Sequence, residues 1–330
     1  MKLIMFSVRD DELAAVNEWS RSRKVDVVTV QEDLTLDTVE KVNGFDGVCI
    51  QQRTDITNEA VYKRLSDFGI KQLSLRTAGY DIIDMNLARK YNIKITNVPA
   101  YSPRSVAELV LTQTMRLIRQ FPSIESDMAK RDFRWSGRIA REIHTLTIGV
   151  IGAGRIGGTT ARLFRALGAT VIAYDPVRNE DLEAVLTYKS SQEEVLAESD
   201  IVTLHVPLDD TTRQLIDETA LDYMKSGAFL INAARGPVVD TSALIKALHS
   251  GQLAGAALDT LDNEQNVFNQ DLSGKELTDK NLDALMKMHN VLITPHIGFY
   301  TTEAVRNMVD IGLDSAVSIL TSGRSENGVQ

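Results

Sequence analysis

Residues 146–175 read LTIGVIGAGRIGGTTARLFRALGATVIAYD, and this stretch decides the fold of the chain. The apolar run TIGVI leads into the glycine-rich loop GAGRIG at Gly152–Gly157, a segment of helical character follows, and Asp175 closes the next apolar run. Three glycines at these spacings are a weak signal alone. A strand, a glycine turn, a helix and a later acid in this order are the signature of a dinucleotide-binding βαβ unit. We therefore predict a dinucleotide site at this loop.

Each residue of the signature has a physical role in the predicted cofactor site. Gly152 permits a tight turn, Gly154 lets the backbone approach the pyrophosphate, and Gly157 lets the helix pack closely on the sheet. The start of the helix offers free N–H groups and a partial positive charge to the phosphates. Asp175 is expected to accept hydrogen bonds from the adenosine ribose and to repel a 2′-phosphate, which favours NAD over NADP. Arg178 is interpreted as a solvated surface charge.

Apolar runs that alternate with helical segments extend through the whole chain. Five such runs lie within the first hundred residues, and six more lie between Leu146 and Pro295. This alternation implies parallel strands joined by right-handed crossovers. We expect an α/β protein with two doubly wound domains, Rossmann-like or flavodoxin-like, and a cleft between them. The expected bounds are 1–100 plus 299–330 for a substrate-binding domain and 101–298 for an NAD-binding domain.

Two segments predict long helices. Residues 105–121, SVAELVLTQTMRLIRQF, are apolar on more than one face, which indicates a helix buried between domains or used in a subunit contact. Residues 301–323 predict a single amphipathic helix that ends near Gly323. If the first domain needs this last helix as a packing partner, the C-terminal segment belongs to the same domain as the N-terminus.

The composition limits the classes of protein and partner. The chain has 330 residues, 43% hydrophobic and 25% charged, which suits a globular protein of two domains. A net charge of −9 argues against nucleic acid or an anionic membrane as the main partner. The single cysteine, Cys49, lies in the apolar run GVCI, so we expect a buried, inert thiol, no internal disulfide and a reducing cytoplasm.

Several kinds of site and segment are not indicated by the sequence. The N-terminal apolar run is too short for a signal peptide, and no stretch approaches the length of a membrane span. Histidines and cysteines are too few and too scattered for a zinc site, so no metal is expected.

Three polar residues that follow separate apolar runs form the candidate catalytic set. They are Arg235 in NAARGP, Glu264 in DTLDNE and His296 in ITPHIG. In open α/β sheets, ligands bind outside the carboxyl ends of the strands, and each of these residues follows such an end. We therefore expect the three side chains to face one crevice.

The chemistry of the three residue types suggests a site for a 2-keto or 2-hydroxy acid. Arg235 is expected to hold the substrate carboxylate in a two-bond fork and to polarise the neighbouring carbonyl. His296 is expected to give its proton to the carbonyl oxygen as hydride arrives from the nicotinamide. Glu264 is expected to accept the other ring N–H of His296, which fixes the ring and favours its protonated form.

Simpler interpretations stay open for each of these residues. Arg235 alone fits a surface salt bridge, Glu264 a solvated loop acid, and His296 a histidine that bonds to the backbone. Among the other histidines, His205 in LHVP follows a strand and is kept as a minor candidate for proton transfer. The remaining histidines are interpreted as structural or solvated: His144, His249 and His289.

Taken in order, these motifs resemble the D-isomer-specific 2-hydroxy acid dehydrogenase family. The resemblance runs through GAGRIG, Asp175, LHVP, NAARGP, DTLDNE and TPHIGFY, and it includes SLRTAGYDIIDM and NVPAYSPRSVAE in the first half. It implies NADH-dependent reduction of pyruvate to D-lactate, catalysed by Arg235, Glu264 and His296, in a homodimer formed through the NAD-binding domain.

The same resemblance implies two sets of binding residues. The substrate contacts would be Ala78, Gly79, Tyr101 and Phe299. Besides the loop glycines and Asp175, the NAD contacts would be Arg155, Ile156, Val206, Pro207, Thr212, Ala233 and Asp259.

The chain departs from the family pattern at positions that bear on the choice of substrate. Ile50, followed by Gln51 and Gln52, stands where some members have an aromatic residue, Ala78 where a valine is frequent, and Gly298 where an alanine is frequent. Smaller side chains are expected to widen the pocket, so a branched or aromatic 2-keto acid is a possible substrate.

The sequence therefore leaves more than one interpretation of the function to weigh. Within the family, the alternatives are a D-2-hydroxyisocaproate dehydrogenase or other broad D-2-hydroxy acid dehydrogenase, and an enzyme that makes D-lactate for cell-wall precursors. Formate oxidation is disfavoured, because it is associated with an amide rather than an acid beside the histidine. An NAD-sensing corepressor that binds peptides is the alternative from outside enzymology.

Overall fold

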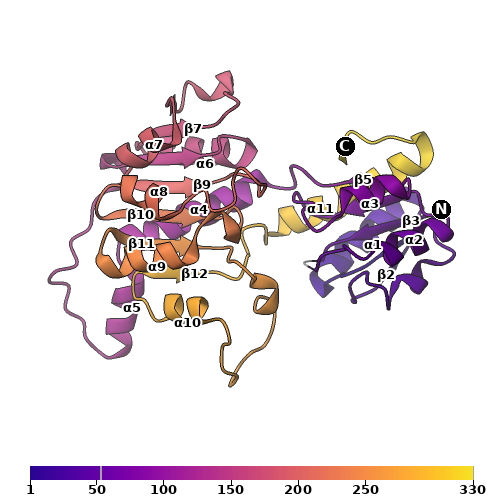
Figure 1. Ribbon diagram of the computed structural model, residues 1–330, viewed down its shortest axis with the longest axis horizontal. Coiled ribbons are helices and arrows are strands. Elements are labelled where there is room, and N and C mark those ends of the chain that lie inside the picture. Colours follow the sequence, from indigo (N-terminus) through magenta and orange to yellow (C-terminus); the bar gives the residue numbers. More distant parts are fainter. Residues whose placement is uncertain (53, 330) are drawn as a thin grey trace. The chain divides into compact units, whose positions relative to one another are not determined.

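The chain folds into two compact units. A computed structural model describes residues 1–52 and 54–329. Unit 1 comprises Met1–Ser102 and Tyr300–Gln330, and unit 2 comprises Pro103–Phe299. Figure 1 shows that each unit holds its own sheet with helices around it. These limits differ by one or two residues from those expected, 100/101 and 298/299.

Unit 1 is built on a six-stranded sheet in the order β13-β5-β4-β3-β1-β2. Its first five strands are parallel in the order 2-1-3-4-5, which is the flavodoxin-like arrangement, and β13 adds an antiparallel edge beside β5. The strands are β1 (Lys2–Met5), β2 (Asp26–Thr29), β3 (Gly47–Ile50), β4 (Gln72–Leu75), β5 (Lys94–Thr96) and β13 (Gly328–Val329).

Helices cover both faces of this sheet because its side chains alternate between two cores. Leu3 and Met5 pack with α1 and α11 on one face, whereas Ile4 and Phe6 pack with α2 and α3 on the other. The helices are α1 (Leu13–Arg23), α2 (Glu59–Asp67), α3 (Met85–Lys90) and α11 (Thr302–Ser322). The last helix of the chain thus completes the unit that the first strand begins.

Unit 2 contains seven parallel strands in the order β12-β11-β10-β9-β6-β7-β8. Numbered from β6, this order contains the 3-2-1-4-5-6 arrangement of dinucleotide-binding domains and one further strand. The strands are β6 (Thr147–Ile151), β7 (Thr170–Tyr174), β8 (Thr187–Tyr188), β9 (Ile201–Leu204), β10 (Ala228–Asn232), β11 (Leu253–Leu258) and β12 (Val291–Ile293). The predicted doubly wound fold class is confirmed for both units.

Two layers of helices enclose the sheet of unit 2. Helices α4 and α6 pack together on one face, and the helices from α7 to α9 bury their apolar sides on the other. The helices are α4 (Pro103–Ile118), α5 (Phe121–Ala129), α6 (Arg155–Ala166), α7 (Gln192–Glu198), α8 (Glu218–Tyr223), α9 (Thr241–Ser250) and α10 (Lys280–Met286). Helix α4 ends earlier than predicted because Gln120 adopts a left-handed φ of 56°, and Pro122 then helps to start α5.

Membrane-spanning helices and clusters of metal ligands are absent from the described residues. None of their helices combines the length and the apolar character needed to cross a membrane. In residues 1–52 and 54–329, no group of three or more His, Cys, Asp or Glu side chains is placed to hold a metal ion. Cys49 is buried as expected, and burial raises the pKa of its thiol.

A buried ion pair crosses the core of unit 1. The Arg76 and Glu12 side chains are both fully buried, with 3.0 Å between Arg76 Nε and Glu12 Oε1. The Arg76 guanidinium also donates to the carbonyls of Phe6 and Ser7, each at 3.2 Å. The pair therefore ties the loop after β1 to the end of β4.

We expect Arg76→Met to destabilise the protein by about 3–5 kcal/mol, because it leaves the buried Glu12 carboxylate without its main partner. Asp67→Asn is the matched control, since it breaks the exposed Lys63–Asp67 pair and should cost less than about 1 kcal/mol. Urea unfolding of both variants measures the difference. Equal losses of stability would show that the buried pair has no special weight.

Candidate active site

The three glycines of the cofactor loop differ in the space around them. Gly152 has a left-handed φ of +89°, and a Cβ there would lie 2.8 Å from the backbone of His205. A Cβ on Gly157 would lie 1.9 Å from Gly152 O, whereas one on Gly154 would meet nothing within 4 Å. Gly152 and Gly157 are thus required by the protein itself. The open space at Gly154, which is the N-cap of α6, suits the approach of a pyrophosphate.

Asp175 follows β7 and connects that strand to the glycine loop. Its Oδ2 accepts a hydrogen bond from Ala153 N at 2.7 Å, and its Oδ1 accepts one from Val177 N at 2.8 Å. These bonds hold the carboxylate beside the loop, where the ribose of a dinucleotide binds in this fold. The Arg178 guanidinium lies over the Tyr188 ring at 5.6 Å.

The other predicted cofactor contacts lie around the same edge of the sheet. Arg155 and Ile156 begin α6, Val206 and Pro207 follow β9, and Ala233 follows β10. Thr212 Oγ1 donates to Pro207 O at 2.7 Å and so closes the loop after β9.

Arg235, Glu264 and His296 follow three neighbouring parallel strands, β10, β11 and β12. Glu264 and His296 are in direct contact through Glu264 Oε1 and His296 Nδ1. The second oxygen of Glu264 accepts from Leu261 N at 3.0 Å. Arg235 Nη1 donates to Ala234 O at 2.9 Å. The structure therefore brings two of the three residues together as an acid–imidazole pair and places the third at the end of the adjacent strand.

His296 lies in a short loop, Thr294–Gly298, called the histidine loop below. Its backbone has a left-handed φ of 54°, which is uncommon for a residue other than glycine. The carboxylate of Asp259 holds this loop, because it accepts from Thr294 Oγ1 at 2.5 Å, Ile297 N at 2.9 Å and Gly298 N at 2.8 Å. Asp259 was expected to contact NAD; in the structure it fixes the loop, and a cofactor contact stays a prediction.

His205 is less suited to proton transfer than His296. Burial lowers the pKa of His205 to about 3, so its ring is neutral near pH 7. Its Nε2 lies 3.0 Å from Thr203 Oγ1. A ring that is neutral near pH 7 is a much weaker acid than an imidazolium, so His205 is the less suitable proton donor for carbonyl reduction.

The predicted substrate residues occupy ordered positions in their units. In unit 1, the Ala78 and Gly79 carbonyls accept from Asn97 Nδ2 at 2.6 Å and Thr77 Oγ1 at 2.7 Å, and Tyr101 O accepts from Asn307 Nδ2 at 2.7 Å. In unit 2, the Phe299 ring meets the His296 ring edge to face, with centroids 6.4 Å apart.

The departures from the family pattern have defined surroundings within their units. Ile50 is completely buried and packs in the core of unit 1. A Cβ at Gly298 would lie 2.9 Å from Asp259 Oδ2, so the glycine leaves room for this carboxylate. Gln52 bonds to Leu34 N at 2.8 Å, and Gln51 accepts from Arg9 Nη1 at 2.8 Å. A wider substrate pocket stays a prediction.

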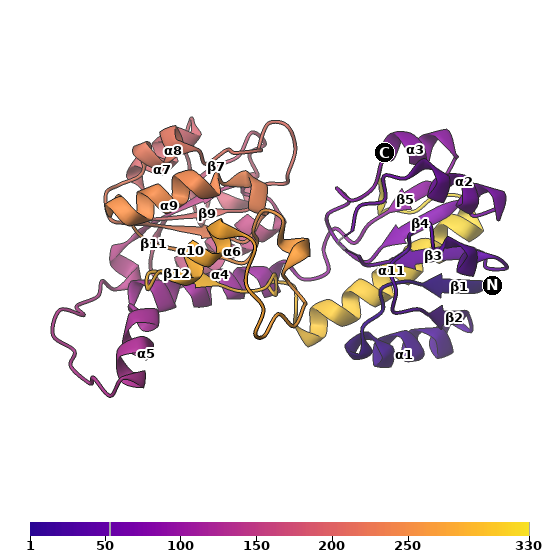
Figure 2. The same ribbon diagram turned by 60° about the horizontal axis from the view of Figure 1, so that its bottom comes forward.

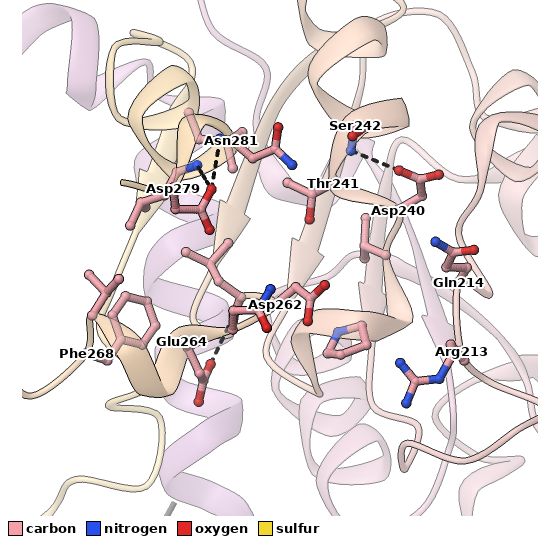
Figure 3. A pocket seen from close by; sticks show the side chains of 17 residues that line it. Arg213, Gln214, Asp240, Thr241, Ser242, Asp262, Glu264, Phe268, Asp279 and Asn281 are labelled. Carbon is pink, nitrogen blue, oxygen red and sulfur yellow. Dashed lines mark hydrogen bonds between the residues drawn. The ribbon is translucent and has the colours of Figure 1, made fainter. Parts of the chain in front are cut away.

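A pocket that the sequence did not indicate lies behind Glu264. Figure 3 shows Glu264 in its wall, together with Arg213, Asp240 and Asn281. Its volume is about 300 Å³. Asp240 and Asp279, which also line it, cap the starts of α9 and α10. The lining residues come from loops and from the first turns of α9 and α10, and no local sequence pattern joins them.

Known proteins with similar sequences and structures identify the family. A family model described as "D-isomer specific 2-hydroxyacid dehydrogenase, NAD binding domain" matches residues 111–298. A D-lactate dehydrogenase of Lactiplantibacillus plantarum is 44% identical, with 100% of this chain and 99% of that protein covered. The solved structure of a D-lactate dehydrogenase from Sporolactobacillus sp. is 57% identical, with a TM-score of 0.87 and coverage of 100% and 99%.

A solved D-2-hydroxyisocaproate dehydrogenase is also similar, at 36% identity and a TM-score of 0.91, covering 100% of this chain and 99% of that one. The chain belongs to the D-isomer-specific 2-hydroxyacid dehydrogenase family. It is an NAD-dependent oxidoreductase, which confirms the predicted family, enzyme class and cofactor.

A methyl group would meet open space at Gly154 but backbone atoms at Gly157, and this difference provides a test of the cofactor loop. We expect Gly154→Ala to leave the free energy of unfolding within about 0.5 kcal/mol of the parent value and to weaken NADH binding about tenfold or more. Gly157→Ala should instead lower stability by about 1–3 kcal/mol, because its Cβ collides with backbone. Thermal unfolding and NADH fluorescence titration measure both effects. Tight NADH binding by Gly154→Ala would contradict the assigned approach of the pyrophosphate.

Proposed function

We propose that this enzyme reduces pyruvate to D-lactate with NADH, in a reversible reaction. The contact between Glu264 and His296, at strand ends next to Arg235, is the observation that carries the proposal. A carboxylate-bound imidazole beside a guanidinium provides a proton donor and an anion-binding group, which is what a 2-keto acid requires. The D-lactate dehydrogenases of Lactiplantibacillus plantarum and Sporolactobacillus sp. support the choice of substrate.

NAD binding is assigned to the edge of the unit 2 sheet that carries the glycine loop. Gly154 and the first amides of α6 face the pyrophosphate, and Asp175 accepts hydrogen bonds from the ribose. The same assignment includes contacts from residues after β9 and β10 and from Asp259. When bound, the reduced nicotinamide supplies a hydride to the substrate carbonyl carbon.

His296 acts as the proton donor in the proposed reaction. Because its Nδ1 bonds to Glu264, its Nε2 is the ring nitrogen that gives a proton to the carbonyl oxygen. Glu264 keeps the ring in one orientation and stabilises its positive charge, and its own position is fixed by Leu261 N. In the oxidative direction the neutral ring takes the proton back.

Arg235 binds the carboxylate of the substrate. The bond from its Nη1 to Ala234 O limits the orientations of the guanidinium. A guanidinium fork matches a carboxylate with two parallel hydrogen bonds, so it positions the acid and polarises the adjacent carbonyl. We assign the remaining substrate contacts to Phe299, to Tyr101 and to the backbone at Ala78 and Gly79.

We also propose that the enzyme is a homodimer that uses α5 and the segment after it. Helix α5 buries none of its residues, and large apolar side chains continue beyond it, with Trp135 86% and Ile139 93% exposed. Figures 1 and 2 both show this part extending from the body of unit 2. Such an apolar projection is characteristic of a surface that another protein chain covers.

The Glu264–His296 contact predicts a loss of rate when the acid is removed. Glu264→Gln keeps the size of the side chain but removes its negative charge from the proton donor, so kcat for pyruvate should fall about tenfold or more. His205→Gln is the control, since a ring that is neutral near pH 7 is not the proposed proton donor and its loss should leave kcat near the parent value. Initial rates of NADH oxidation at saturating pyruvate provide the measurement. A parent-like kcat in Glu264→Gln would separate this acid from proton transfer.

The relative kcat/KM values for pyruvate and for a branched 2-keto acid distinguish the proposed function from its nearest alternative. The similar D-2-hydroxyisocaproate dehydrogenase makes a branched 2-keto acid the specific competitor. We expect kcat/KM for pyruvate to exceed that for 4-methyl-2-oxopentanoate by about tenfold or more, because the chain is more similar to the D-lactate dehydrogenase of Sporolactobacillus sp. than to the D-2-hydroxyisocaproate dehydrogenase. A higher kcat/KM for the branched acid would replace pyruvate by that substrate class.

Charged residues introduced into the exposed apolar segment after α5 test the dimer proposal. Sedimentation velocity should find a dimer for the parent and a monomer for the Trp135→Asp, Ile139→Asp double variant, because the charges would be buried in the contact. Met286→Asp is the control, since Met286 is exposed on α10 but lies outside this region. A double variant that stays dimeric would place the interface elsewhere.

A further inference from the structure

Helix α4 contacts both ends of the histidine loop. Near the start of the helix, Ser105 Oγ donates to Gly298 O at 2.5 Å. Two turns later, Gln113 Nε2 donates to Thr294 Oγ1 at 2.8 Å. Ser105 and Gln113 are both buried. These bonds join a helix on one face of the sheet to the two residues that bracket His296.

The contact at Thr294 belongs to a chain of three polar groups. Thr294 Oγ1 lies 2.5 Å from Asp259 Oδ1, and Gln113 Nε2 lies 2.8 Å from the same hydroxyl. An ionised carboxylate only accepts, so the hydroxyl donates to Asp259 and must accept from the Gln113 amide. The direction of every proton in this chain is therefore fixed, and the Asp259 carboxylate is oriented toward Ile297 N and Gly298 N.

The cost of burying Gln113 argues against a role in packing alone. Among the described residues, its Oε1 is buried without a hydrogen-bond partner. An unsatisfied buried amide oxygen is unfavourable, and an apolar side chain of similar size would fill the same space without that penalty. The hydrogen bond from its Nε2 to Thr294 Oγ1 is therefore the contribution that an apolar side chain could not replace.

We propose that Gln113 and Thr294 are positioning residues that hold His296 in its working orientation through Asp259. His296 has a left-handed backbone, which the surrounding contacts must maintain. Without the Thr294 hydroxyl, Asp259 loses one of its donors and the loop gains freedom next to the reacting ring. A small displacement of the proton donor lowers the rate of the chemical step more than it lowers substrate or cofactor binding. The inference rests on the proposed role of His296.

The test compares isosteric changes at two threonines that follow neighbouring strands, Thr294 after β12 and Thr260 after β11. Thr294→Val removes the hydroxyl that links Gln113 to Asp259. Thr260→Val is the matched control, because Thr260 Oγ1 is buried and has no hydrogen-bond partner among the described residues. We expect Thr294→Val to lower kcat for pyruvate about tenfold or more, with the Kd for NADH and the melting temperature near the parent values. Thr260→Val should keep the parent kcat, and Thr294→Ser should recover most of it.

A second pair of variants breaks the chain at its other end. Gln113→Met should lower kcat in the same way, while Thr114→Val, at another buried hydroxyl without a partner in the described residues, should not. Adding Gln113→Met to Thr294→Val should cause little further loss, because both remove one linkage. If Thr294→Val impairs folding, the comparison of Gln113→Met with Thr114→Val decides alone.

The outcomes distinguish this inference from the proposed function. If the parent enzyme reduces pyruvate and His296→Asn does not, but Thr294→Val and Gln113→Met keep the parent kcat, only the positioning role is overturned. If His296→Asn retains the parent kcat, the proposed mechanism fails and the positioning role fails with it. Losses of kcat in Thr294→Val and Gln113→Met with unchanged NADH binding support both.

Discussion

The carboxylate of Asp259 is the point on which the arrangement of the candidate site depends. It is buried, and it accepts hydrogen bonds from the side chain of Thr294 and from two backbone amides of the histidine loop. A buried charge of this kind is stable only when it is satisfied by donors, so the loop closes on it in one conformation. That conformation includes the left-handed backbone of His296 and places its ring against Glu264. Arg235 follows β10, on the other side of β11 from β12, and is proposed to supply the positive charge that a carboxylate substrate needs.

The parallel sheet explains how residues so far apart in sequence belong to one site. All seven strands of unit 2 are parallel, so their carboxyl ends meet at one edge. The glycine loop follows β6, Asp175 follows β7, and the three candidate catalytic residues follow β10, β11 and β12. Hydride supply and proton transfer are therefore assigned to one edge of one sheet. The pocket behind Glu264 is lined in part by the loops that follow β9, β10 and β11.

The sequence predicted the parts of the structure that are encoded locally. Glycine spacing identified the loop at Gly152, and alternation of apolar runs predicted the doubly wound class of both units. The two-residue strand β8 was not predicted, because it has too few residues to form an apolar run. The bond between Gln113 and Thr294 joins residues 181 positions apart, so no local pattern indicates it. The close approach of Gly298 to Asp259 is hidden for the same reason, because these residues are far apart in the sequence.

The central claim is that this site transfers a hydride and a proton to pyruvate to give the D-acid. Chiral chromatography of the product formed from pyruvate and NADH tests it most directly, because it reports the reaction, the substrate and the face of attack together. The account predicts one D-lactate for each NADH consumed. Formation of L-lactate, a racemate or no lactate would contradict it.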